Sequence, residues 1–245
     1  MTDAPSTGSA PHVFAFEGRG GFPVWASAGE PAAPQRRQDA RGRVIPERGR
    51  CSLAQVLNYW HDAVAAAGDR RWHYYAQNHW RRAVADILEM AARGGEAGGT
   101  DLKSVLQEGP RWRGAVALLG YSNGGDACYQ VANALRARGV EVDLIVTADP
   151  VRKPLRGLGL LGFRKPENVI AWHNFYQRCD RRTLAGCLPI VGRSVRAADV
   201  DHRLTAEDFR EPMNAAFAHV WIPAHRLVVE TIRRQLRDLA VPPSM

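Results

Sequence analysis

Ser122 is the residue whose surroundings point most directly to chemistry. It lies in GYSNG (120–124), which matches G-x-S-x-G, between an apolar run (115–119) and a helical pattern that begins just after it. A serine displayed on a tight strand-to-helix turn needs glycines two residues before and after, because side chains there would crowd the turn. Such a serine is a candidate nucleophile, and the N–H of Asn123, next in the chain, is a candidate oxyanion donor.

Two phosphate-binding turns share this strand, turn and helix context, and the residues argue against both. A dinucleotide fingerprint G-x-G-x-x-G that starts at Gly120 would need glycine at position 122, where this chain has serine. A phosphate P-loop would need Gly-Lys-Ser/Thr after the turn, and none follows. The remaining alternative is a small polar residue that merely fits the corner, so chemistry at Ser122 depends on partners elsewhere in the chain.

Asp149 is the candidate carboxylate. It follows the apolar run VDLIVT (142–147), and the carboxyl ends of parallel strands meet at one edge of a sheet. We therefore expect Asp149 near the serine turn. The alternative is an Asp-Pro pair that only caps a loop, and Asp180, Asp199 and Asp201 stay open as other acids.

His219 is the candidate base, because a serine hydroxyl alone is too weak a nucleophile. It lies within AAFAHVWI (215–222), for which the apolar residues predict a weak strand, ahead of the last helical pattern. His202, in a charged stretch and expected to be exposed, and His225 are the alternatives. His173 falls inside another expected strand and is interpreted as structural.

A second oxyanion donor is expected in the loop after an early strand. The stretch FEGRGGF (16–22) fits this role, since its glycines allow backbone N–H groups to approach a ligand closely. Gly18 and Arg19 are the candidate donors. A plain glycine turn is the alternative.

The elements that must position these residues alternate between strands and helices. Apolar runs predict strands at 12–16, 115–119, 142–147, 168–177 and 215–222, and three- and four-residue spacing predicts helices at 53–67, 78–93, 101–107, after the serine turn, and 224–239. This alternation predicts an α/β fold with a mostly parallel central sheet and helices on both faces. We expect a disordered tail at 1–11, a long connection at 23–50, and a single domain over 12–240.

Composition excludes several classes of function. Of the 245 residues 45% are apolar and 24% charged, which is typical of a soluble globular protein. The net charge of +8 is carried mainly by scattered arginines without a dense stripe, so we expect no nucleic-acid partner. No apolar run is long enough to span a membrane and no secretory signal starts the chain, so we expect a cytoplasmic protein. The four cysteines form no CxxC pair and the histidines lack zinc-like spacing, so no metal is expected.

The sequence resembles the α/β-hydrolase superfamily over residues 12–240, on the stretches LLGYSNGG (118–125), TADPV (147–151) and AHVWIP (218–223). Within that superfamily it is similar to lipase, esterase and thioesterase-like groups. The resemblance implies the α/β-hydrolase fold and a serine hydrolase with a catalytic triad of Ser122, Asp149 and His219. An ester or thioester of a small-molecule acyl substrate would be cleaved through an acyl-enzyme intermediate, without a cofactor.

The chain departs from that family in having EGRGG at 17–21 where an oxyanion motif with His-Gly is usual. The second half of the oxyanion hole is therefore less well defined by the resemblance. A non-catalytic protein that binds a ligand through the same cleft is the alternative function. The apolar, glycine-rich segment 154–163 is interpreted as a buried loop, with an acyl pocket or lid as the alternatives.

Overall fold

The computed structural model contains a six-stranded sheet in the order β2-β1-β3-β4-β6-β8, in which every neighbouring pair is parallel. The residues that the structure describes are 9–18, 60–66, 71–96, 114–152, 162–178, 192–209, 218–219 and 221–240. Several predictions fall on other residues and lie outside the described part: the connection at 23–50, the helix at 101–107, most of the segment 154–163, and the candidates Arg19 and Asp180.

Strands and helices alternate as far as β4, as expected from the sequence, and in the described residues four further strands follow β4 before α6. The strands are β1 (Ser9–Phe16), β2 (Arg71–Tyr75), β3 (Gly114–Tyr121), β4 (Val142–Ala148), β5 (Phe163–Arg164), β6 (Val169–Gln177), β7 (Val195–Arg196) and β8 (Val200–Leu204). The helices are α2 (Trp80–Glu96), α4 (Asn123–Arg136) and α6 (Arg226–Ala240), with short 3-10 turns η1 (Gln77–His79), η2 (Ala206–Asp208) and η3 (Ile222–Ala224). Residues 60–65 are also helical, within the expected helix at 53–67. Strand β1 begins at Ser9, so the end of the expected tail belongs to the sheet.

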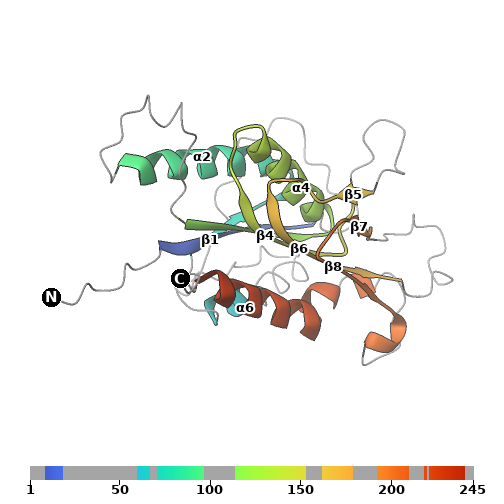
Figure 1. The fold of residues 1–245 in the computed structure, drawn as a ribbon. Helices are drawn as coiled ribbons and strands as arrows, with labels where there is room; N and C mark the ends of the chain where they lie inside the picture. Colours follow the sequence, from blue (N-terminus) through green and yellow to red (C-terminus); the bar gives the residue numbers. More distant parts are fainter. Residues whose placement is uncertain are drawn as a thin grey trace, which may run out of the picture.

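Helices cover both faces of the sheet, which confirms the predicted α/β class (Figure 1). Helices α2 and α4 pack on one face, and α6 and the helical segment 60–65 pack on the other. Successive strand residues alternate between the two cores: Phe14 and Leu118 face α2 and α4, whereas Val13 and Leu119 face α6. Burial on both faces explains why the central strands read as continuous apolar runs.

The sequence analysis missed the two edge strands, β2 and β8. Strand β8 reads VDHRL, and only its last residue, Leu204, is buried. Strand β2 reads RWHYY, and none of its residues is fully buried. An edge strand is covered less than a central one and tolerates charged side chains, so neither segment carries the apolar run that identified the inner strands.

The strand predicted at 215–222 is wrong. Residues 218–219 and 221 have helical backbone, and η3 begins at Ile222. Ala218 and Ile222, four positions apart, are both fully buried, a spacing that places them on one side of a helical turn. A short apolar run does not by itself distinguish a strand from a buried helical turn.

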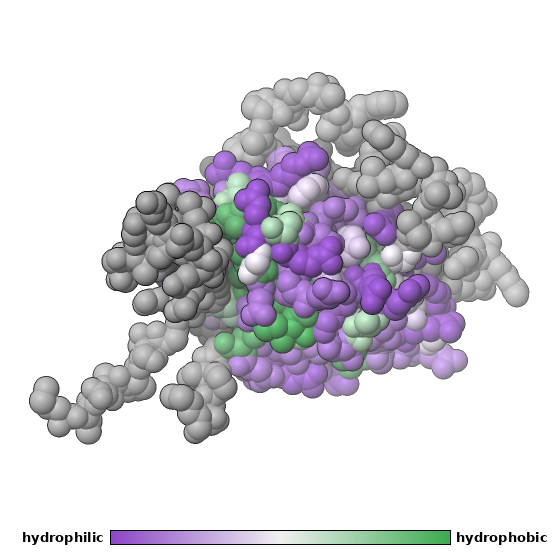
Figure 2. Space-filling view, turned by 45° about the horizontal axis from the view of Figure 1, so that its top comes forward, coloured by the Kyte–Doolittle hydropathy of each residue, from purple (hydrophilic) through white to green (hydrophobic). Residues whose placement is uncertain are grey.

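The surface of the described part is mainly polar. The face shown in Figure 2 is largely hydrophilic, with small hydrophobic patches between the polar side chains. Two large hydrophobic side chains of the described part are exposed, Ile170 at 57% and Trp221 at 48%. Within the described residues, no helix combines the length and the apolar content that crossing a membrane requires.

Candidate active site

Ser122 lies at the junction of β3 and α4 in a strained backbone conformation. Its φ is 54° and its ψ is −122°, a combination that is rare for a residue with a side chain. Two backbone hydrogen bonds tie this turn to β4 and to the residues just after it: the Ser122 N–H donates to Ala148 O (3.0 Å), and the Val151 N–H donates to Ser122 O (2.9 Å). The end of β4 therefore holds the serine in the strained conformation that displays its side chain.

The two glycines of the G-x-S-x-G pattern are required by close packing. A Cβ at Gly120 would lie 2.6 Å from Gly124 O and 2.7 Å from Cys128 Sγ. A Cβ at Gly124 would overlap the carbonyl oxygen of Phe16 in β1. These contacts agree with the prediction that side chains at both positions would crowd the turn.

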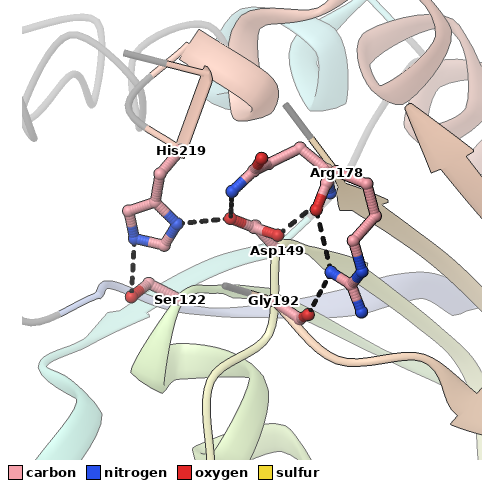
Figure 3. A network of polar contacts seen from close by, with 6 residues as sticks. Ser122, Asp149, Arg178, Gly192 and His219 are labelled. Atoms are coloured by element: carbon pink, nitrogen blue, oxygen red, sulfur yellow. Dashed lines mark hydrogen bonds and ion pairs between the residues drawn. The ribbon is translucent and has the colours of Figure 1, made fainter. Parts of the chain in front are cut away.

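Ser122, His219 and Asp149 form a continuous chain of hydrogen bonds (Figure 3). The Ser122 Oγ lies 3.1 Å from His219 Nε2, and His219 Nδ1 lies 2.5 Å from Asp149 Oδ2. All three side chains are buried: the residues are 5%, 6% and 0% exposed, respectively. The structure thus brings together the three residues that the sequence singled out separately.

The carboxylate determines which nitrogen of His219 carries the proton. An ionised carboxylate oxygen can only accept a hydrogen bond, so in the neutral ring the proton lies on Nδ1, which donates to Asp149. The Nε2 atom is then an acceptor that faces the Ser122 hydroxyl. This arrangement allows His219 to take a proton from Ser122 and allows Asp149 to stabilise the imidazolium that results.

Asp149 follows β4 directly and occupies a left-handed backbone conformation, with φ of 49°. Aspartate tolerates this region better than most residues with a side chain. Its N–H donates to Phe175 O of β6 (2.6 Å). Burial, and to a lesser extent the nearby Asp149 carboxylate, raises the pKa of the Tyr121 phenol above its ordinary value. The Tyr121 ring in turn packs beside the His219 ring, with centroids 5.2 Å apart.

The described alternative acids serve other contacts. Asp199 pairs with Lys165 Nζ at 2.8 Å. Asp201 accepts from Asn174 Nδ2 at 2.6 Å and from the Val195 N–H at 3.0 Å. Among the described residues, His219 bonds with Asp149 and with neither of these acids, and both acids hold strands and loops together.

The alternative histidines are also engaged elsewhere. His202 lies exposed on edge strand β8, as expected, with its ring beside Phe175. His225 Nε2 contacts the Asp208 carbonyl oxygen at 2.9 Å. His173 lies buried in β6, as expected for a structural residue, and burial lowers its pKa.

Gly18 and Asn123 approach the serine from two sides. A Cβ added at Gly18 would lie 2.6 Å from Ser122 Cβ, so the backbone after β1 runs directly beside the serine. Asn123 is the first residue of α4, and its N–H has no partner four residues back within the helix. Sheet order explains the arrangement, because β3 lies between β1 and β4. Ser122 therefore has Gly18 on one side and Asp149 on the other.

Three further residues at this site were not identified from the sequence: Gln177, Arg178 and Gly192. Gln177 and Arg178 follow one another at the end of β6. Gln177 contacts Asp149, and Arg178 contacts Gly192 (Figure 3). The position of Gln177 at the end of a strand next to β4 was a usable signal. No signal in the sequence pointed to Gly192, since its position beside Asp149 is visible only in the folded chain.

Within the described part of the chain, no cluster of three or more His, Cys, Asp or Glu side chains is arranged to hold a metal ion. Comparison of the sequence with models of known protein families gave no match, and comparison with curated proteins gave none either.

Proposed function

We propose that this protein is a serine hydrolase that cleaves an ester or thioester of a small-molecule acyl substrate, with Ser122, His219 and Asp149 as its catalytic triad. The observation that carries the proposal is the position of the His219 ring, 3.1 Å from Ser122 Oγ and 2.5 Å from Asp149 Oδ2. The distance between Ser122 Oγ and His219 Nε2 is within the range that proton transfer from a nucleophile to a base requires.

The surroundings of the three residues support membership of the α/β-hydrolase superfamily as part of this proposal. The serine lies on a strained turn between a parallel strand and a helix, and the order along the chain is serine, acid, histidine. Both features characterise the nucleophile elbow and the triad of that superfamily.

The proposed reaction uses this geometry in two stages. Ser122 Oγ attacks the carbonyl carbon of the substrate while His219 Nε2 takes the hydroxyl proton, and Asp149 stabilises the imidazolium. The negative charge on the carbonyl oxygen is stabilised by the N–H of Asn123 and a backbone N–H near Gly18. His219 then gives its proton to the leaving alcohol or thiol, and an acyl-Ser122 ester remains. Water, deprotonated by His219, attacks this ester. His219 then returns the proton to Ser122 Oγ as the acyl–oxygen bond breaks, which releases the acid and restores the free serine.

Hydrolysis of p-nitrophenyl acetate and labelling by a fluorophosphonate probe test the proposal together. We expect wild type to turn over the ester and to be labelled on Ser122, because only an activated serine reacts with the probe. Ser122→Ala should lower kcat/KM by at least about 1000-fold. Ser194→Ala, at an exposed serine, is the matched control and should retain full activity.

Two results would contradict the proposal. Hydrolysis that survives in Ser122→Ala would place the chemistry elsewhere. A folded wild type that neither hydrolyses the ester nor takes the probe would favour a non-catalytic protein that uses the same cleft for binding.

A further inference from the structure

Gln177 and Arg178 lie where β6 ends, beside the turn that carries Asp149. Strands β4 and β6 are parallel neighbours, and their register pairs Ala148 with Phe175. The chain beyond Phe175 therefore runs alongside Asp149. Both residues have polar side chains, and the Gln177 side chain is fully buried, so its partners inside the protein determine its role.

Gln177 contacts both oxygens of the Asp149 carboxylate. Its backbone N–H donates to Oδ1 at 3.1 Å, and its side-chain Nε2 donates to Oδ2 at 3.3 Å. Oδ2 is also the oxygen that accepts from His219 Nδ1. The carboxylate is thus held from one side by Gln177 while it holds the histidine on the other.

Arg178 connects the two chain segments that enclose this carboxylate. Its Nη1 atom donates to Gln177 O at 2.8 Å and to Gly192 O at 2.7 Å (Figure 3). A Cβ at Gly192 would overlap Asp149 Oδ1, so the backbone there packs directly against the carboxylate. One guanidinium therefore fixes the spacing between the Gln177 segment and the Gly192 segment.

We propose that Gln177 is a positioning residue for the Asp149 carboxylate, and that Arg178 keeps the two segments around that carboxylate at the separation it needs. This inference rests on the proposed hydrolase function. A carboxylate held by one partner can turn about its last side-chain bond, whereas donors to both oxygens fix its plane. The direction of His219 Nδ1–H, and through it the position of Nε2 at Ser122, follows from that plane. Gln177 acts through Asp149 and contacts no reacting atom.

Two substitutions at position 177 separate positioning from simple packing. Gln177→Met keeps the length of the side chain and removes the Nε2 donor. We expect a loss of about 10- to 100-fold in kcat/KM and in the rate of probe labelling, at every pH tested, as for a lost hydrogen bond to a charged group.

Gln177→Glu keeps the shape of the side chain and places a second carboxyl group against Asp149. At neutral and higher pH the two negative charges repel and activity falls. When the new carboxyl group takes a proton, its O–H can donate to Asp149 Oδ2 as the amide does. The ratio of variant to wild-type kcat/KM should therefore rise as the pH is lowered, a response that a purely structural role would not produce.

The role of Arg178 is tested by comparing two substitutions at this position. Arg178→Met should lower kcat/KM, and Arg178→Lys, which can still donate to one of the two carbonyl oxygens, should lower it less. Gln130→Met, at a partly buried glutamine on α4, is the matched control and should leave activity unchanged.

The outcomes distinguish this inference from the proposed function. If wild type is neither active nor labelled on Ser122, both are overturned. A second outcome is an active wild type, a Gln177→Met variant with the same kcat/KM, and a ratio of Gln177→Glu to wild-type kcat/KM that does not vary with pH. This outcome would overturn the positioning role of Gln177 and leave the proposed hydrolase function standing. Thermal melting checks each variant, and should Gln177→Met fail to fold, the pH response of the isosteric Gln177→Glu decides the question.

Discussion

The Ser122 hydroxyl lies 3.1 Å from His219 Nε2, although 97 positions separate the two residues in the sequence. Ser122 is held at the end of β3 by backbone hydrogen bonds to the end of β4 and to the residues just after it. His219 comes from the segment between β8 and α6, where the fully buried Ala218 and Ile222 flank it. The contact therefore depends on the packing of two segments that are distant in the sequence. Variants of the site residues test the chemistry, and variants of buried residues elsewhere test the packing.

Asp149→Asn should lower kcat/KM by about 10,000-fold while the protein stays folded. An amide in place of the carboxylate can donate to His219 Nδ1, which favours the ring form with its proton on Nε2. That form cannot accept the Ser122 proton. Ester hydrolysis measures the effect and circular dichroism the fold. Asp238→Asn, at an exposed position of α6, is the control, and a loss of less than tenfold in Asp149→Asn would rule out the assigned role.

Gly18→Ala should lower kcat/KM by at least about tenfold, because a Cβ there would lie 2.6 Å from Ser122 Cβ and 3.1 Å from Tyr121 O. The backbone at 18 must then move away from the serine, together with the oxyanion donor proposed there. Gly162→Ala is the matched control, since its nearest neighbour would be Ser194 O at 3.9 Å. Wild-type kinetics in Gly18→Ala would show that this loop does not contribute to the site.

His12 should make the protein less stable in mild acid. Burial, together with the nearby His73 and Arg71, lowers the pKa of His12 from 6.5 to about 4. Between these values the unfolded chain binds more protons than the folded one, so the free energy of unfolding rises with pH there and falls as the pH drops from 6.5 toward 4. The loss attributable to His12 should be about 1 to 3 kcal/mol.

Urea unfolding at several pH values measures the effect of His12. In His12→Gln the dependence on pH between 4 and 6.5 should become shallower than in wild type, and His202→Gln, at an exposed histidine of β8, is the comparison variant. An identical pH dependence in wild type and His12→Gln would contradict the prediction.

Trp60→Phe should lower the free energy of unfolding by about 1 to 3 kcal/mol. The indole Nε1–H donates to Pro223 O at 2.8 Å, and Trp60 is fully buried. Phenylalanine leaves the carbonyl oxygen without this donor and leaves space where the larger ring was. Trp221→Phe, at a half-exposed tryptophan, is the comparison. Equal urea midpoints for the two variants would show that the buried bond adds nothing.

Much of the central fold could be predicted because its signals are local. Strands β1, β3, β4 and β6 are buried on both faces, so each is visible as an apolar run. The turn at Ser122 was visible because two glycines are needed within five residues of chain. Asp149 could be placed from its position at the end of a strand, since parallel strands present their carboxyl ends at one edge.

The sequence by itself thus determined the α/β class, the serine turn and a short list of partners for it. Only the tertiary structure decided that His219 and Asp149, rather than His202, His225, Asp199 or Asp201, contact one another and the serine. It also revealed the edge strands β2 and β8, the helical turn around His219, and the enclosure of Asp149 by Gln177 and Gly192. The physical reason is that an apolar pattern reports how much of a segment is buried, whereas hydrogen-bond partners depend on which segments the folded chain places side by side.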